Sequence, residues 1–392
     1  MSAVRKVLIQ GAGIGGLALA NALARNGIEV DVVDGAGRSG VLGVGLNQPS
    51  NALGALDEIG LRDACLAIGV PFEAVEIWAP NGDLIAQLPP AEGIYPKPSN
   101  NGISRPAYFD ILRSAAEQAG ARVRVGRTII SIHDRGDDVV VETGTWIGRH
   151  EAPEPDSNPV EEHYDLVVGF DGARSRVRQH LFGDKYRPDF TGTGNWRSII
   201  PRPSWVNGVT LVPAPGNVKA VLTPISEDEM YFGLVSPEPG NPRHAPEDYV
   251  ASFRERTKAF TGKLAELREQ VSDDTVNVYV PIEYVVVREP WYRGRVVIAG
   301  DAAHTSPPHI SQGAAMALED AVTLSAALRD HESVEDALAG WYERRRDRAS
   351  LVADMSLALL HEEMHEELSE RDTQLLAMGL PAVQAKLAQE AY

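Results

Sequence analysis

A carboxylate and the start of a predicted helix stand a few residues apart in the last third of the chain. Gly300-Asp301 follows a short apolar run, Arg295 to Ala299, that is typical of a buried strand. After two prolines, an Ala-rich segment from Gln312 to Leu328 is predicted to be helical, so its first amides, at Gly313 and Ala314, lack intrahelical partners. The carboxylate can accept hydrogen bonds from ligand hydroxyls, and the helix start attracts negative charge. A ligand with hydroxyls at one end and an electron-rich carbonyl at the other fits this stretch.

A second constellation opens the chain. Strands are predicted over Val4 to Ile9 and Glu29 to Val33, with a helix over Leu17 to Asn26 between them. The loop before the helix has the spacing Gly-x-Gly-x-x-Gly, and Asp34 follows the second strand. Glycines alone would indicate only a turn, but this order of strand, glycine loop, helix, strand and acid predicts a dinucleotide site.

Each of the three glycines of this unit, and the acid that follows the second strand, has a physical role. Gly11 permits the tight turn, Gly13 lets the backbone approach a pyrophosphate, and Gly16 lets the helix pack on the strand. Asp34 is placed to accept from an adenosine ribose hydroxyl. A second Gly-rich segment, from Gly35 to Gly45, could run beside the bound ligand. Together with the first stretch, this unit predicts a flavin dinucleotide, whose ribityl hydroxyls would meet Asp301.

Composition limits the partners of the protein. The chain has 392 residues, a formal charge of −18 and one cysteine, Cys65. The acidic balance argues against nucleic-acid binding or a polybasic membrane patch. A single cysteine excludes an intrachain disulfide and fits a reducing compartment. The first apolar run is too short for a signal peptide and no long apolar span follows, so we expect a cytoplasmic protein.

Further elements are predicted between these two constellations. We expect a helix over Asn51 to Leu66, a hairpin over Phe72 to Leu88 that turns at Asn81-Gly82, and a helix that begins at Pro106. Arg105, just before that helix, can reach a phosphate or ribityl oxygen, although a surface salt bridge is an equally good interpretation. Strands are then predicted over Arg122 to Asp134 and Asp138 to Thr143, before a polar loop or long hairpin tip from Trp146 to His163.

A third strand, turn and helix start contains Asp171-Gly172 and a small positive patch, formed by Arg174, Arg176 and Arg178. The region from Tyr186 to Pro281 then changes character. Its short strands are predicted over Gly194 to Ile200, Val209 to Val212, Val218 to Thr223 and Met230 to Leu234. With a helix from Pro246 to Gln270, it predicts an antiparallel sheet with a covering helix, a natural substrate domain. From Val334 onward the chain is predicted to be helical towards Glu370.

One motif in the C-terminal helix points to a different chemistry. His361-Glu362-Glu363-Met364-His365 matches the zinc-protease pattern H-E-x-x-H. Its surroundings are rich in glutamate and no third ligand is evident, so we interpret it as the polar face of an exposed helix and predict no metal site.

The spaced set formed by the glycine loop, Arg105, Asp171-Gly172 and Gly300-Asp301 resembles the single-component FAD-dependent aromatic hydroxylases. These are the group A flavoprotein monooxygenases with the para-hydroxybenzoate hydroxylase fold, and the similarity covers about the first 350 residues. The resemblance implies that FAD is bound at positions matching Arg105 and Asp301 and at the helix start of Gly313 and Ala314. We also assign Gly45, Ile129 and Pro308 to the cofactor site.

The resemblance implies an α/β fold: a Rossmann-like FAD/NAD(P)-binding domain, an inserted antiparallel-sheet substrate domain and a C-terminal helical segment. The predicted FAD domain is discontinuous, over residues 1–72, 101–183 and 280–345. Residues 73–100 and 184–279 form the predicted substrate domain, and residues 346–392 the helical tail. Departures from the family pattern are Ser311, where the family has a glycine, and a single tryptophan, Trp196, where the related halogenases carry two.

The implied reaction uses NADH or NADPH, FAD and O₂ to hydroxylate an aromatic or heteroaromatic small molecule through a flavin C4a-hydroperoxide. The sequence contains only one complete dinucleotide fingerprint, which FAD would occupy. The nicotinamide nucleotide is therefore expected to bind transiently, and whether Arg38 or the patch of Arg174 to Arg178 helps to bind it is left open. Catalytic candidates are His309 at the expected flavin edge, Arg197 for a carboxylate or phenolate, and Tyr231 or Tyr284 for hydrogen bonding. His304 is expected to be structural.

Two other classes of function stay open from the sequence. One is a flavin-dependent epoxidase, reductase or dehydrogenase of the same fold that acts on a non-aromatic substrate. The other is a non-catalytic FAD-binding protein. Neither alternative predicts nucleic-acid or membrane partners, and a monomer or homodimer is expected in each case.

Overall fold

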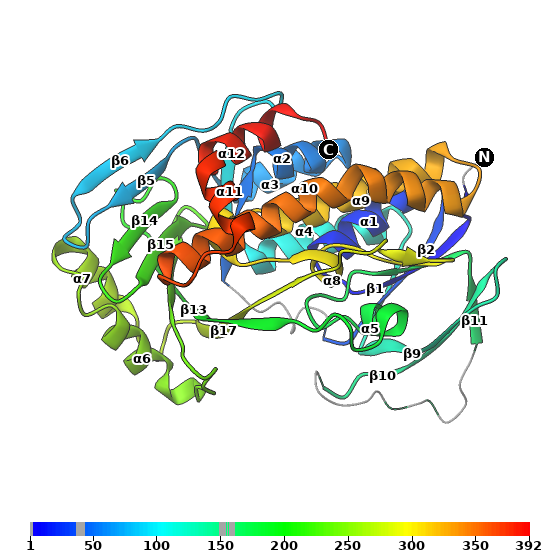
Figure 1. Ribbon diagram of the computed structural model, residues 1–392, viewed down its shortest axis with the longest axis horizontal. Helices are drawn as coiled ribbons and strands as arrows, with labels where there is room; N and C mark the ends of the chain where they lie inside the picture. Colours follow the sequence, from blue (N-terminus) through cyan, green and yellow to red (C-terminus); the bar gives the residue numbers. More distant parts are fainter. Residues whose placement is uncertain (1–2, 37–43, 149–153, 155, 157–160) are drawn as a thin grey trace.

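The structure is a computed structural model that describes residues 3–36, 44–148, 154, 156 and 161–392 (Figure 1). Its first core is a six-stranded sheet assembled from four separate stretches of the chain. The strand order is β18 (Tyr292–Arg293), β19 (Val296–Ile298), β12 (Leu166–Gly169), β1 (Lys6–Gln10), β2 (Glu29–Asp34) and β8 (Arg122–Val125). All pairs are parallel except β18–β19. This sheet confirms the predicted Rossmann-like fold.

Apolar helices cover this sheet, which explains why its strands are almost continuously apolar. The helices of this layer are α1 (Ile14–Arg25), α2 (Ser50–Glu58), α3 (Arg62–Ile68), α4 (Arg105–Gln118), α5 (Arg176–Phe182), α8 (Asp301–His304) and α9 (Gly313–Asp330). The carboxyl ends of β1 and β19 lead directly into the two glycine turns of the predicted cofactor site, because β1 precedes Gly11 and β19 precedes Gly300. Ligands of open α/β sheets bind at this end of the strands.

A seven-stranded sheet forms the second core. Its order is β17 (Asn277–Val286), β13 (Asp189–Pro201), β16 (Glu229–Pro237), β15 (Val218–Pro224), β14 (Thr210–Ala214), β5 (Val75–Trp78) and β6 (Leu84–Leu88). Neighbours are antiparallel except β14 and β5. Helices α6 (Tyr249–Arg256) and α7 (Gly262–Gln270) pack on one face and share a separate cluster of buried apolar side chains with it. The predicted antiparallel sheet with helical cover is therefore confirmed.

Two three-stranded sheets flank these layers. One has the order β11 (Glu161–Tyr164), β10 (Val139–Thr145) and β9 (Arg127–Asp134), and the other β3 (Gly45–Pro49), β7 (Asn100–Ser104) and β4 (Val70–Phe72). The second of these lies between the glycine loop region and the seven-stranded sheet, since Gly102 of β7 is in close contact with Pro224 at the end of β15. It carries Gly45 and Asn47 towards the cavity described below.

The C-terminal region is helical, as predicted. The long helix α10 (Val334–Glu363) runs along α9 and reaches the seven-stranded sheet, and α11 (Glu370–Met378) and α12 (Leu380–Gln389) fold back beside it (Figure 1). Two of the predicted domain limits fall inside single elements. Helix α10 runs without a break across the limit predicted between residues 345 and 346, and strand β17 runs across the limit predicted between residues 279 and 280. Within the described part of the chain, we find no helix of the length and apolarity required to cross a membrane.

Several predicted elements are shorter in the structure. The helix predicted over Asn51 to Leu66 is two helices, α2 and α3, separated at Gly60, whose φ of +73° ends the first. The strand predicted over Arg122 to Asp134 is divided at Gly126 (φ +79°) into β8 and β9, which belong to different sheets.

Two further predictions of extent were wrong. The helix predicted over Pro246 to Gln270 is interrupted, because α6 ends at Arg256 and α7 begins at Gly262, which has a φ of +55°. The C-terminal helix stops at Glu363 instead of continuing towards Glu370. The segment from Trp146 to His163 belongs to a hairpin, one of the two forms predicted for it, because β10 pairs antiparallel with β11, which begins at Glu161. Much of this segment lies outside the described residues.

Candidate active site

The glycine loop after β1 contains two kinds of glycine. Two of them are required by the packing of the fold, and the third leaves open space that a ligand could use. A Cβ on Gly11 would lie 2.3 Å from the carbonyl oxygen of Phe170, and one on Gly16 would lie 1.9 Å from the carbonyl oxygen of Gly11. A Cβ on Gly13 would meet no atom within 4 Å. Gly13 lines the cavity between the two large sheets that is described below, whereas Gly11 and Gly16 do not. The space above Gly13 is therefore a cradle that a Cβ would partly fill, which fits the close approach of a pyrophosphate.

Asp34 holds the shape of this loop. Its Oδ2 accepts from the amide of Ala12 at 2.8 Å, and its Oδ1 accepts from the amide of Ala36 at 2.9 Å. A carboxylate fixed in this way keeps lone pairs for a ribose hydroxyl. Arg38, considered for nicotinamide binding, lies outside the described residues, as do Gly37, Gly40 and Gly43 of the Gly-rich segment.

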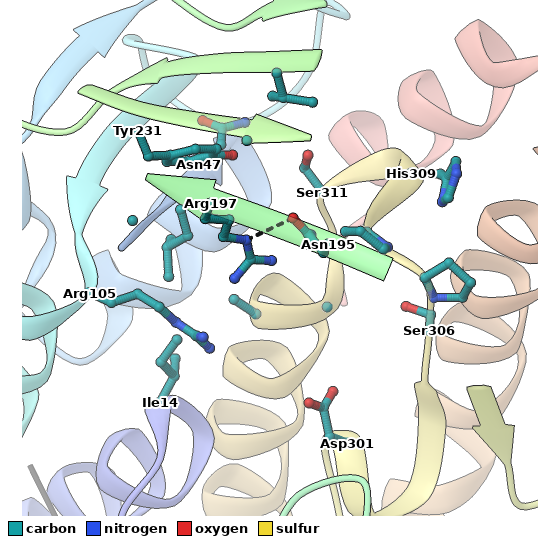
Figure 2. A pocket seen from close by; sticks show the side chains of 18 of the residues that line it. Ile14, Asn47, Arg105, Asn195, Arg197, Tyr231, Asp301, Ser306, His309 and Ser311 are labelled. Carbon is teal, nitrogen blue, oxygen red and sulfur yellow. Dashed lines mark hydrogen bonds between the residues drawn. The ribbon is translucent and has the colours of Figure 1, made fainter. Parts of the chain in front are cut away.

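The Gly300-Asp301 turn ends β19 at the same edge of the sheet. Gly300 has a φ of +57°, a conformation that favours glycine, and its amide donates to Asp320 Oδ2 at 2.9 Å. Asp301 lines the cavity (Figure 2). The residue is exposed to solvent through the cavity, but desolvation at its depth there raises the carboxyl pKa, an effect that His304 and Arg105 partly offset.

The start of α9 faces the same cavity. Helix α9 begins at Gly313, and both Gly313 and Ala314 line the cavity, as predicted from the sequence. A Cβ on Gly313 would meet no atom within 4 Å, so there is open space beside this residue. Ser311, the departure from the family pattern, has a φ of +55°, which explains why a glycine is usual there.

These turns meet in one cavity of about 360 Å³ between the six-stranded and seven-stranded sheets (Figure 2). The predicted site residues that line it are Gly13, Gly45, Arg105, Arg197, Tyr231, Asp301, Pro308, His309, Gly313 and Ala314. Four predicted cofactor residues do not line it: Gly11, Gly16, Asp34 and Ile129. Ile129 is buried in β9, and its amide donates to Gln10 Oε1 at 2.9 Å.

Two arginines bring positive charge into this cavity of an acidic protein. Figure 2 shows Arg105, at the start of α4, and Arg197, on β13, directed into the same part of it. Burial lowers the pKa of Arg105 to about 10, with a further contribution from Arg197, and burial lowers the pKa of Arg197 as well. Two desolvated cations in proximity favour an anionic or electron-rich ligand between them.

Arg197 is held by its own strand. Its Nε donates to Asn195 Oδ1 at 3.2 Å, and no carboxylate of the described residues forms an ion pair with it. Asn195 and Arg197 are two residues apart on β13 and therefore project from the same face of the sheet. The same period of two could have identified Asn195 from the sequence, and it relates Lys219 to Val221 on β15, which both line the cavity.

Other candidates are occupied by contacts with the protein. His304 is buried, and its Nε2 lies 2.6 Å from Asp320 Oδ2, which fits the structural role expected for it. Tyr284 donates to Asp354 Oδ1 at 2.9 Å and does not line the cavity. In the positive patch, Arg174 donates to Glu283 at 2.6 Å, and Arg178 is buried against carbonyl oxygens, including that of Ala302 at 2.9 Å.

The H-E-x-x-H motif does not have the geometry that a zinc protease needs. Helix α10 ends at Glu363, and His365 has a φ of +56°, so the two histidines are not one turn apart on a helix. His361 Nδ1 lies 3.1 Å from Asp372 Oδ2 instead. Among the residues that the structure describes, no group of three or more His, Cys, Asp or Glu side chains is arranged to hold a metal ion.

A family profile described as "FAD binding domain" matches residues 5–356, which is most of the chain. The chain belongs to this family. It is a group A FAD-dependent aromatic hydroxylase, a flavoprotein monooxygenase whose cofactor is FAD. The cavity fits that cofactor, because Gly13, Asp301 and the two residues at the start of α9 all line it.

Three relatives show how far the likeness extends. The flavoprotein is 29% identical over 367 residues to a putative FAD-dependent monooxygenase, YetM, of Bacillus subtilis, covering 93% of this chain and 95% of the relative. It is 31% identical over 342 residues to a 2-heptyl-3-hydroxy-4(1H)-quinolone synthase of Pseudomonas aeruginosa, covering 81% and 79%. The structure of Klebsiella pneumoniae HpxO with FAD and uric acid has the same fold, with a TM-score of 0.78 at 21% identity over 98% and 93% of the chains.

Proposed function

We propose that this monooxygenase uses NADH or NADPH and O₂ to hydroxylate an aromatic or heteroaromatic small molecule that carries an acidic group. The observation that carries the proposal is the position of Arg197. It projects from the seven-stranded sheet into the cavity that also contains the flavin-binding turns, and it lacks a carboxylate partner among the described residues. The quinolone synthase is named for a heteroaromatic compound, which supports this class of substrate.

Different residues of the cavity would bind the cofactor and the substrate. When bound, FAD supplies the hydride-accepting and oxygen chemistry of the reaction. Gly13, Asp301 and the amides of Gly313 and Ala314 would hold it along the wall of the six-stranded sheet. Arg197 would pair with a carboxylate or phenolate of the substrate, and Tyr231 on β16 would donate a hydrogen bond from the same sheet.

The apolar wall supports this assignment. Leu211, Val221 and Val235 line the same part of the cavity as Arg197, so a flat ring can be buried while its charged group is paired. His309 stays the predicted proton-handling residue, and its surroundings are considered below. A cytoplasmic location and a monomeric or homodimeric state stay predictions from the sequence.

The test is a panel of phenolic and heteroaromatic compounds added to FAD-loaded protein with NADH or NADPH. We expect at least one acidic aromatic compound to accelerate nicotinamide oxidation and to gain one oxygen atom in its mass. Arg197→Met should raise the KM for that compound by about tenfold to a hundredfold, because a hydrogen bond to a charged group is lost. Arg187→Met, at an exposed site on the same domain, is the control. If aliphatic compounds alone are turned over, the epoxidase, reductase or dehydrogenase alternative replaces this proposal.

A further inference from the structure

Three ionisable side chains meet at one wall of the cavity, and each comes from a different part of the chain. His309 Nε2 lies 3.2 Å from Glu363 Oε2, and Lys219 Nζ donates to Glu363 Oε1 at 2.5 Å. Lys219 belongs to β15, His309 to the 3-10 turn η3 (Pro308–Ile310), and Glu363 is the last residue of α10. One carboxylate therefore joins the substrate sheet, the loop before α9 and the C-terminal helix.

The imidazole in this cluster is sealed from solvent. The His309 side chain is 1% exposed, and its Nδ1 is buried with no hydrogen-bond partner among the described residues. The Glu363 side chain is 37% exposed, so the cluster extends from the buried wall to the protein surface. In Figure 2 the imidazole lies on the far side of Ser311 from Arg105, and its backbone segment borders the cavity.

The carboxylate determines which nitrogen of the ring carries the proton. A carboxylate beside Nε2 favours the tautomer with hydrogen on Nε2, which leaves the lone pair of Nδ1 as an acceptor. Burial lowers the pKa of His309, and Glu363 only partly offsets this effect, so the ring is neutral near neutral pH. Burial alone would raise the pKa of Glu363, but His309 and Lys219 lower it to about 2.

We propose that Glu363 is a positioning residue of the active site, which holds His309 as a neutral imidazole with Nδ1 as acceptor and ties Lys219 to the same point. This inference rests on the proposed function, because the segment that carries His309 borders the cavity in which the substrate would bind. Protonation of the buried ring would disturb that wall, so activity should fall as the pH drops through the His309 pKa.

Glu363 was hidden from sequence reasoning for two reasons. It lies beyond residue 356, where the family match ends, and it is one of the two variable positions inside the H-E-x-x-H pattern. The motif thus contributes to the active site through a residue that the zinc interpretation ignores. Helix α10 brings it there, because the helix ends where its last turn meets η3 and β15.

The test uses charge changes of opposite sign. The charged groups that act on the imidazole are Glu363 from α10 and Lys219 from β15. Glu363→Gln keeps a hydrogen-bond acceptor but removes the anion, so the His309 pKa should fall by about half a unit or more. Lys219→Met removes the cation, so that pKa should rise by a similar amount. Glu362→Gln, an exposed neighbour with the same loss of charge, should change neither.

Two readouts follow these variants. The ¹⁵N shifts of labelled histidine, assigned by the loss of signals in His309→Asn, report both the tautomer and the pKa without any turnover. The acidic limb of the pH profile of kcat/KM, with the accelerating aromatic compound, should move in the same directions as the histidine pKa. The two charges shift the histidine pKa whatever the role of Glu363, so the pH profile decides: a purely structural role would change stability in these variants but would leave the acidic limb of kcat/KM in place.

The inference is overturned if both variants shift the His309 pKa in one direction, or if neither shifts it, or if the proton lies on Nδ1. If Glu363→Gln does not fold, the upward shift required of Lys219→Met decides the question alone. Failure of the proposed function is distinguishable, since no aromatic compound would then accelerate oxidation while the histidine titrations still respond to Glu363 and Lys219.

Discussion

The carboxylate of Asp320, in the second turn of α9, accepts a hydrogen bond from the amide of Gly300 at 2.9 Å. Asp320 is completely buried, and the same oxygen lies 2.6 Å from His304 Nε2. Its other oxygen accepts from Arg345 Nε at 2.8 Å. The Gly300 turn, which places Asp301 at the cavity, is therefore held by the carboxylate of a residue 20 positions further along the chain.

Removing the charge of Asp320 should weaken both the fold and the cofactor site. In Asp320→Asn, the buried guanidinium of Arg345 would keep Glu319 as a partner but lose the second carboxylate. Breaking a buried ion pair costs about 3–5 kcal/mol, and we expect a loss of that order in the free energy of unfolding. Urea unfolding followed by tryptophan fluorescence measures it, since Trp341 donates to the carbonyl oxygen of Asp320.

Asp330→Asn provides the matched control for this variant. Asp330 ends the same helix, is exposed and pairs only with its neighbour Arg329 among the described residues. An exposed pair of this kind contributes little, so its unfolding curve should overlay that of the unmodified protein. Equal losses in the two variants would refute the role given to Asp320.

The contribution of Asp320 should also depend on pH with a definite sign. Burial would raise its pKa, but His304 and Arg345 lower it to about 2, which is below the ordinary value of 3.8. A carboxyl whose folded pKa is depressed stabilises fully above its unfolded pKa and loses that contribution as the pH falls through the folded value. The difference in unfolding free energy between the protein and Asp320→Asn should therefore be constant above about pH 4 and shrink towards about pH 2. A difference that grows on acidification would contradict this assignment.

Two glycine variants separate folding from cofactor binding. In Gly16→Ala the new Cβ would lie 1.9 Å from the Gly11 carbonyl oxygen, so α1 cannot pack and little folded protein is expected. In Gly13→Ala the Cβ meets no atom within 4 Å, and the backbone, at φ −78°, accepts any residue. The apoprotein should unfold within about 0.5 kcal/mol of the unmodified protein. Its affinity for FAD should fall about tenfold or more, because the methyl group occupies the space of the pyrophosphate.

Flavin fluorescence titration measures that affinity, and circular dichroism measures the folded fraction. Gly27→Ala, at a surface turn with φ +80°, is a useful comparison, because it tests backbone strain without ligand contact. If Gly13→Ala binds FAD as tightly as the unmodified protein does, the cradle is not the pyrophosphate site.

Replacing Asp301 should affect the stability of the apoprotein and the binding of FAD in opposite directions. Its carboxyl pKa is raised, first of all by desolvation at its depth in the cavity, although the residue is exposed to solvent through the cavity. A carboxyl of this kind destabilises the folded apoprotein as the pH rises above the unfolded pKa, because ionisation is easier in the unfolded chain. Because solvent in the cavity screens this effect, Asp301→Asn should increase the melting temperature of the apoprotein only slightly at neutral pH, while Asp301→Ala should bind FAD loosely or not at all. Full flavin occupancy in Asp301→Ala would refute its ribityl role.

Much of the cofactor half of the molecule followed from local patterns. Gly11, Gly16 and Gly300 have positions that only glycine can occupy without a clash or strain, and such requirements are visible in a sequence as fixed spacings. The apolar runs before them predict buried parallel strands for the same reason. Boundaries were harder to predict where one glycine, such as Gly60 or Gly126, ends an element inside a segment of unbroken propensity.

The substrate half depends on contacts that no local pattern encodes. Arg197 was recognisable as a charged residue on a strand, but its lack of a carboxylate partner is a property of the folded chain. Glu363 meets His309 and Lys219 only because α10 ends at one particular turn. The contacts of Ile129 show the same limit, since its amide donates to Gln10 rather than facing the cavity.

Ser311 is a strained position at which the family residue can be restored. Its φ of +55° costs a non-glycine residue about 1 kcal/mol, whereas glycine adopts it freely but loses more entropy on folding. Ser311→Gly should therefore change the free energy of unfolding by less than about 1 kcal/mol, in either direction. Ser311→Val should lower it by about 1–3 kcal/mol, because a β-branched side chain is strongly disfavoured in this conformation. Since Ser311 lines the cavity beside Gly313, the valine variant should also bind FAD more weakly, as measured by flavin fluorescence. Equal stability of the glycine and valine variants would show that the loop does not keep the left-handed conformation at this residue.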